Sequence, residues 1–138
     1  MTTRMPYPYG LADARAFVAL SQELDPRRQI TFALEHQDAG VIGCLGFHSN
    51  GRAPLEIGYW LGRPHWGKGL ATEAVRAALK WAAEEWGRRA IASGHFDDND
   101  ASAKVLIKAG FLYTGEVQRR FSRARCLDGA TRMMMWIA

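Results

Sequence analysis

A glycine-rich turn between a strand pattern and a helix pattern constrains the fold of this chain most. Residues 54–61 (PLEIGYWL) predict a strand, residues 70–87 place apolar side chains at helical spacing, and Gly67 and Gly69 lie between them. A helix N-terminus leaves about four backbone N–H groups unpaired and carries roughly half a positive charge. Glycine lets the backbone approach an anion without strain. The stretch predicts a phosphate site, with a merely connecting turn as the alternative.

Two common phosphate motifs do not fit this stretch. A P-loop needs Ser or Thr after its lysine to hold Mg²⁺, and this chain has Gly69. A dinucleotide fingerprint needs Gly or Ala at the position of Thr72. The strands before the turn also read as hairpins, whereas a P-loop core uses parallel strands joined by helices. A nucleotide-binding domain with a degraded P-loop stays as a minor alternative.

Patterning elsewhere predicts a single α/β domain over residues 1–138, with a mostly antiparallel sheet flanked by helices. Helices are expected at 11–24, 70–87 and, as a short one, within 97–111, and strands at 29–36, 41–48, 54–61, 88–96, 112–124 and 130–138. Asn50-Gly51 and Asp128-Gly129 are the expected hairpin turns.

The composition of the chain limits the kinds of partner and cofactor that we expect. With 48% hydrophobic residues and 23% charged residues, the 138-residue chain has the composition of a soluble globular domain. It lacks the apolar run of about 18 residues that a membrane span needs, and its N-terminus lacks a secretory pattern, so we expect a cytoplasmic protein without a membrane partner. Cys44 and Cys126 have no metal-binding spacing, so we expect no metal and two buried thiols. The net charge of +4 suits an acidic ligand, but no basic-aromatic pattern indicates nucleic acid.

Three motifs follow one another in the chain: LEIGYWL (55–61), PHWGKGLATEA (64–74) and NDASAKVLIKAGF (99–111). In this order they resemble the GNAT superfamily of acetyl-CoA-dependent N-acetyltransferases, specifically its ribosomal-protein (RimJ/RimL-like) branch. The family's R/Q-x-x-G-x-G/A phosphate motif falls on residues 66–71, with Trp66 where Arg or Gln is usual.

The resemblance implies a cleft between splayed central strands, 54–61 and 88–96, that takes acetyl-CoA as co-substrate. It assigns the pyrophosphate to the backbone of Trp66, Gly67, Lys68, Gly69, Leu70 and Ala71, and the pantetheine arm to the backbone of Tyr59, Trp60 and Leu61 and the side chain of Asn99. It implies direct acetyl transfer to a primary amine, either a protein N-terminus or a small molecule. The family's first strand is missing or short here, which exposes a sheet edge and favours a homodimer.

The resemblance also assigns the chemistry. The tyrosine that usually protonates the leaving thiolate would fall at Leu106, so that acid is absent. Ser102 stands where this branch has a serine thought to replace it, although serine is also common in a first helical turn. A thiol with a pKa near 8.5 leaves as thiolate at modest cost. A coenzyme-A-binding module without catalysis is therefore the main alternative.

Glu56 is the candidate general base. Strand alternation puts it on one face with Gly58 and Trp60, and a water is expected to relay the proton. The alternative is a cross-strand ion pair with an arginine. We expect mainly structural roles for His48, His65 and His95, packing roles for Trp60, Trp66, Trp81 and Trp86, and a solvated or anion-attracting face from Arg119, Arg120, Arg123, Arg125 and Arg132.

Overall fold

The computed structural model describes residues 8–49, 54–123 and 125–138. Within these residues the chain forms, in order, α1 (Leu11–Gln22), β1 (Ile30–His36), β2 (Gly40–His48), β3 (Leu55–Leu61), a 3₁₀ turn η1 (Arg63–His65), α2 (Leu70–Glu84), β4 (Ala90–Phe96), α3 (Asp100–Lys108), β5 (Leu112–Ser122) and β6 (Leu127–Ile137). The expected elements are all present, with ends shifted by a few residues. The expected Asn50-Gly51 turn lies outside the described residues.

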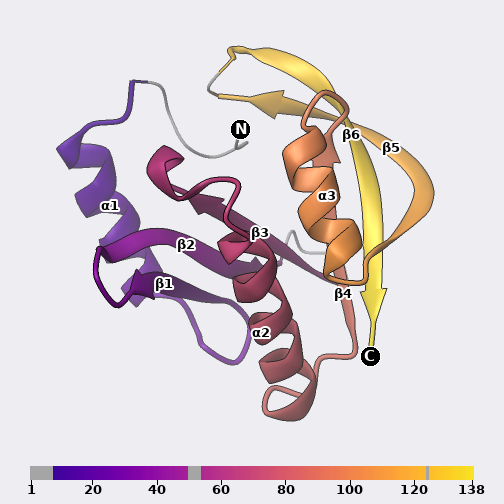
Figure 1. Cartoon of the computed structure of the whole chain (residues 1–138), viewed down its shortest axis with the longest axis horizontal. Helices are drawn as coiled ribbons and strands as arrows, with labels where there is room; N and C mark the ends of the chain where they lie inside the picture. The colour runs from indigo at the N-terminus through magenta and orange to yellow at the C-terminus, as the bar shows by residue number, and fades with distance from the viewer. Residues whose placement is uncertain (1–7, 50–53, 124) are drawn as a thin grey trace.

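The strands form one sheet in the order β1-β2-β3-β4-β6-β5. Every neighbouring pair is antiparallel except β3 and β4, which are parallel. Helices α2 and α3 lie side by side over one face, and α1 stands near the β1–β2 end (Figure 1). The predicted α/β fold is confirmed. Among the described residues β1 pairs with β2 alone, which makes it an edge strand of this sheet, and the homodimer stays a prediction.

The core lies between the sheet and the two central helices. Its buried residues are Leu45, Phe47, Ile57, Val75, Leu79, Ala82, Ile91, Leu106, Ala109, Phe111 and Met134. Aromatic side chains pack beside this core near the C-terminal end of α2. The Trp81 and Trp86 rings stack with centroids 5.4 Å apart, and Phe32 contacts Trp81 edge-on. Helix α2 contributes Val75, Leu79 and Ala82 to this core, and Ala74, Ala78 and Trp81 pack beside them. By contrast, α1 has no buried residue.

Two expectations about the last hairpin are wrong. Asp128 and Gly129 do not form the turn; they lie in β6 and pair with Phe121 and Arg120. A Cβ on Gly129 would lie 2.8 Å from the Phe96 ring, so this glycine makes room for an aromatic side chain. The chain reverses between the paired residues Ser122 and Leu127, and Cys126 in this turn has a φ of 54°. The expectation of two buried thiols is also wrong, because Cys126 is exposed and Cys44 is half-buried.

Candidate active site

The two central strands part soon after they meet. The parallel ladder joins β3 to β4 only at Leu55–Ile91 and Glu56–Ala92. One residue further along, the buried Ser93 hydroxyl donates to the Ile57 carbonyl at 3.1 Å. The Ser93 side chain thus bonds to a carbonyl that a backbone N–H would bond to in a continuous ladder. Beyond Ser93 the strands diverge around a cleft of about 510 Å³. The splayed strands predicted from the family resemblance are therefore present.

The cleft has walls from both halves of the chain. Residues of β3, including Tyr59 and Trp60, face His95 on β4 and Asn99 and Ser102 at the start of α3. The remaining wall comes from α1 and the segment before it, including Tyr9, Asp13 and Phe17, and from Arg120 and Arg123 at the end of β5. The partly exposed apolar side of α1 thus faces the cleft, which explains why this amphipathic helix is not buried in the core.

The turn before α2 has the geometry predicted for an anion site. Gly67 and Gly69 have φ of 74° and 81°, a conformation that suits glycine. Gly69 is the N-cap of α2. Within the described part of the chain, the N–H groups of residues 67–72 have no hydrogen-bond acceptor. A Cβ on either glycine would meet no atom within 4 Å, so the space in front of these N–H groups is open.

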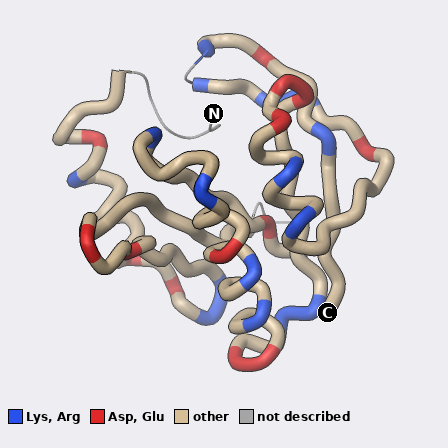
Figure 2. The backbone as a smooth tube through the Cα atoms, viewed as in Figure 1, with Lys and Arg blue, Asp and Glu red and all other residues tan. Residues whose placement is uncertain are grey.

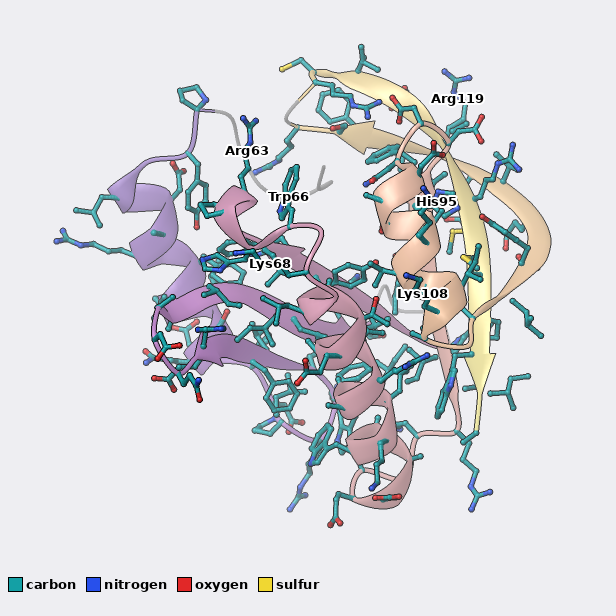
Figure 3. All side chains as sticks on the ribbon, viewed as in Figure 1. Arg63, Trp66, Lys68, His95, Lys108 and Arg119 are labelled. Carbon is teal, nitrogen blue, oxygen red and sulfur yellow. The ribbon has the colours of Figure 1, made fainter. Side chains whose placement is uncertain are left out.

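The side chains around this turn do not cover its unpaired N–H groups. Trp66 is 59% exposed, and its indole N–H donates to the Leu61 carbonyl at 2.7 Å. That bond uses a carbonyl that the sequence assigned to the pantetheine arm. Arg63 and Lys68 lie on the same loop (Figure 3), and further basic residues follow along α2 (Figure 2). The loop is therefore basic as well as rich in unpaired N–H groups.

Three cleft residues are connected by hydrogen bonds at the start of α3. The Ser102 N–H donates to Asn99 Oδ1 at 3.2 Å, so Asn99 caps the helix. The Tyr59 hydroxyl lies 2.9 Å from Ser102 Oγ and 3.3 Å from the Ser102 carbonyl oxygen. Burial raises the pKa of Tyr59 to about 12, and the Ser102 bond offsets a part of this increase. Tyr59 is thus a neutral donor over the physiological pH range.

Glu56 lies on the face shared with Gly58 and Trp60, as predicted, and is 9% exposed. Arg120 binds its carboxylate in a bidentate manner: Nη1 donates to Oε1, and Nη2 donates to Oε2 at 3.0 Å. The Gln118 side-chain oxygen also accepts two bonds from the guanidinium. The arginine partner named as the alternative is therefore present, but it comes from β5 rather than from an adjacent strand. A carboxylate oxygen has a second lone pair, so the ion pair does not exclude a further bond to a water or an amine.

The other candidates have mixed outcomes. Leu106 is completely buried in the core, so its position cannot donate a proton to the cleft. His95 is also buried; its Nδ1 lies 2.9 Å from the Phe96 carbonyl oxygen and its Nε2 lies 2.9 Å from the Tyr113 hydroxyl. A carbonyl only accepts, so His95 donates to it through Nδ1, and its Nε2 makes the hydrogen bond with Tyr113. His48 lines the cleft, whereas His65 belongs to η1 and faces His36.

The arginines of the last hairpin are less solvated than expected. Arg120 binds Glu56, Arg125 binds Asp98 at 2.8 Å, and Arg132 binds Asp97. Arg119 is exposed, and Arg123 lines the cleft. Sequence reasoning missed Ser93 and the contribution of α1. A serine inside the apolar strand AIASGHF was the available signal for the first; nothing local marked the second.

Within the described ranges, no helix is long and apolar enough to cross a membrane, and no three His, Cys, Asp or Glu side chains come together as a metal site. The cofactor expected from the resemblance is an organic thioester, and its phosphates would be bound by backbone N–H groups.

Comparison with known families decides the classification. The model for the acetyltransferase (GNAT) domain matches residues 1–112. This chain is a GNAT protein. The N-acetyltransferase YoaA of Bacillus subtilis (strain 168) is 32% identical over 108 residues, which are 76% of this chain and 59% of that protein. The ribosomal-protein-serine acetyltransferase of Escherichia coli (strain K12) is 29% identical over 107 residues, or 75% and 59% of the two chains. The GNAT chain thus spans about three-fifths of the length of these relatives.

Solved structures share the fold. The microcin C7 self-immunity acetyltransferase MccE, determined with acetyl-CoA and AMP, superposes with a TM-score of 0.81 at 18% identity, over 97% of this chain and 77% of that one. A GNAT-family acetyltransferase of Bacillus anthracis gives a TM-score of 0.78 at 21% identity, over 94% and 75% of the two chains. At these identities the likeness establishes the GNAT fold of the chain.

Proposed function

We propose that this protein transfers an acetyl group from acetyl-CoA directly to a primary amine. One observation carries the proposal: the open row of unpaired N–H groups at residues 67–72 stands at the end of β3, the strand that parts from β4 to form the cleft. An anion site next to the cleft suits a ligand that has a diphosphate at one end and an extended, unbranched chain at the other. The GNAT membership of the chain and the names of its curated relatives support the same activity.

The proposed cofactor contacts follow the sequence prediction except at Trp66 and Leu61. The Trp66 N–H already donates to the Arg63 carbonyl at 3.1 Å, and the Leu61 carbonyl accepts from the Trp66 indole. Gly67, Lys68, Gly69, Leu70 and Ala71 supply backbone N–H groups to the pyrophosphate, and the N-terminal end of the α2 dipole adds positive potential there. The pantetheine arm lies along Tyr59 and Trp60 in the cleft, and Asn99 retains its amide nitrogen as a donor after capping α3. The thioester supplies the activated acetyl group, so the protein needs to orient it and to stabilise the charge that forms.

Glu56 lines the cleft and is the proposed base for the acceptor amine. The free energy needed to neutralise a lysine amine at pH 7 is roughly 4–5 kcal/mol, and that for an α-amine is only about 1 kcal/mol. The Glu56 carboxylate already accepts hydrogen bonds from Arg120, so an acceptor that demands little from its base suits this site. We therefore favour an α-amine, as on a protein N-terminus, over a lysine side chain; a small primary amine of low pKa fits equally well.

Two alternatives predict different binding behaviour. A coenzyme-A-binding module without catalysis is favoured by the buried Leu106 at the usual acid position. A degraded P-loop domain has no support from the sheet, because a P-loop core is built from parallel strands and only one strand pair here is parallel.

The test is a calorimetric titration with acetyl-CoA in EDTA, followed by an assay of thiol release on a panel of peptides and amines. We expect acetyl-CoA to bind without Mg²⁺ and more tightly than ATP, and peptides with free N-termini to be acetylated. Tight binding without turnover on any acceptor would favour the binding module. Mg²⁺-dependent ATP binding without any acetyl-CoA signal would refute the proposal.

A further inference from the structure

The hydroxyl groups of Tyr59 and Ser102 form a pair inside the cleft, although 43 residues separate them in the chain. We propose that Tyr59 is a positioning residue: its hydroxyl donates to Ser102 Oγ and so directs the serine hydrogen toward the sulfur that leaves acetyl-CoA. This inference rests on the proposed acetyl transfer. It assigns to the Tyr59 side chain a task that its predicted backbone role does not include.

The distances favour one arrangement of the hydrogens. Hydrogen bonds between oxygens are usually 2.5–3.0 Å long. The 2.9 Å separation of Tyr59 Oη from Ser102 Oγ is within that range, whereas the 3.3 Å separation from the Ser102 carbonyl is beyond it. A phenol is also the more acidic hydroxyl, so it donates and the serine oxygen accepts. The serine hydrogen is then free to make a bond of its own.

Without Tyr59 the serine would behave differently. A serine in a helix readily turns its hydroxyl back to the carbonyl three or four residues earlier. Ser102 is in the first turn of α3, where the carbonyl of Asn99 is within that reach along the helix. The Tyr59 hydroxyl instead bonds to the serine oxygen from β3, which forms another wall of the cleft. Both partners line the cleft, so the hydrogen directed by this bond can reach a ligand there.

At the leaving group, the chemistry requires a hydrogen bond and no proton transfer. The amine nitrogen attacks the acetyl carbon and gives its proton to the proposed base Glu56 through a water, the C–S bond breaks, and the electron pair leaves on sulfur. A simple thiol has a pKa near 8.5, and burial holds the pKa of Tyr59 at about 12, so transfer of the phenol proton to the thiolate would be uphill. The sulfur therefore leaves as a thiolate that accepts a bond from Ser102, and it takes its proton from solvent after release. This arrangement needs no acid at Leu106.

Titration of bound coenzyme A tests the inference without turnover. The ultraviolet absorbance of the thiolate, measured with and without coenzyme A to subtract the two cysteines, gives the pKa of the bound thiol. In the wild-type protein it should be about one to two units below 8.5, which is the effect of one hydrogen bond to a charged group. Ser102→Ala should lose this hydroxyl contribution, and Tyr59→Phe should lose a large part of it. Ser102→Thr, which keeps the hydroxyl, should retain it.

Kinetics provide the second readout. Tyr59→Phe should lower kcat by about 2- to 10-fold, the range for one net hydrogen bond, with little change in the KM for acetyl-CoA. Because Tyr59 acts through Ser102, the double variant should be no slower than Ser102→Ala. Tyr113→Phe is the matched control: it removes a tyrosine hydroxyl with a side-chain partner, from a residue outside the cleft lining.

The outcomes separate this inference from the proposed function. If wild-type protein and Tyr59→Phe bind coenzyme A with the same thiol pKa, the positioning role is wrong while acetyl transfer stands. Additive rate losses in the double variant would also overturn it. If the wild-type protein binds no coenzyme A, the proposed function fails and this inference fails with it.

Discussion

Arg120 on β5 binds Glu56 on β3 through both guanidinium nitrogens of its fork, although β4 and β6 lie between these strands in the sheet. The pair spans the region where β3 and β4 are still joined, next to the point where they part. It therefore connects the two halves of the sheet at the base of the cleft and fixes the orientation of the carboxylate.

Glu56→Gln should lower the acetylation rate of an α-amine acceptor at pH 7, by about 10²-fold, the lower end of the usual range for general base catalysis. An α-amine has a pKa of about 7.7–8.0 and becomes neutral without help above it, so the deficit should shrink toward pH 9. Acetyl-CoA affinity should be unchanged, because Glu56 is not among its proposed contacts. Rates equal to wild type from pH 6.5 to pH 9 would remove Glu56 from the mechanism.

Arg120→Ala should destabilise the fold. It removes the guanidinium partner of a carboxylate that is only 11% exposed, at a cost of roughly 1–3 kcal/mol in the free energy of unfolding. Arg119→Ala is the control, because Arg119 is an exposed neighbour on the same strand without an ion pair among the described residues, and it should change stability by less than about 0.5 kcal/mol. Urea denaturation of both variants measures the difference. Equal midpoints would show that the pair contributes nothing to stability.

Gly69→Glu should abolish acetyl-CoA binding in a folded protein. Gly69 and Gly87 both have a positive φ, 81° and 67°, and open space where a side chain would go. A side chain at either position should cost about 1–2 kcal/mol of stability through backbone strain alone. Only Gly69 precedes α2, so only there would the carboxylate occupy the anion site. Calorimetry on Gly69→Glu and Gly87→Glu separates strain from binding, and equal affinities would mean that the turn before α2 is only a connection.

Two buried serines should respond in opposite ways to replacement by alanine. Ser93 donates to the Ile57 carbonyl, so Ser93→Ala should cost about 1–3 kcal/mol by leaving a buried acceptor unsatisfied. Ser122 is fully buried, and its hydroxyl has no partner within the described residues. Ser122→Ala should therefore be neutral or slightly stabilising. Thermal unfolding of both variants measures this contrast, and a larger loss in Ser122→Ala would contradict it.

The local features of the fold were predictable from sequence because they depend on neighbouring residues. The glycine turn and α2 follow from the run of glycines and the helical spacing that begins at Leu70. The Asp128-Gly129 turn was mispredicted because the same glycine serves a packing need, the approach of the Phe96 ring. Turn signals cannot separate these two uses of glycine.

The contacts across the cleft were not predictable in detail. Glu56 and Arg120 are 64 positions apart, and their meeting depends on the registers of three strand pairs and on the bend of the last hairpin. The Tyr59–Ser102 bond likewise depends on how far β3 swings from the start of α3. The alternation of side chains along the strand predicted the face on which Glu56 lies. It could not predict how close Glu56 comes to β5, because β4 and β6 lie between the two strands in the sheet.

The gap between β3 and β4 also has a consequence for the thermodynamics of binding. The facing edges of the two strands are apart beyond Ser93, so a ligand that binds between them competes with no ladder bond there. The missing ladder bonds lower the stability of the fold, and they do not reduce the affinity for the ligand. Occupancy of the cleft should consequently protect the whole sheet, and the melting temperature should rise steadily with the concentration of any molecule that fills it.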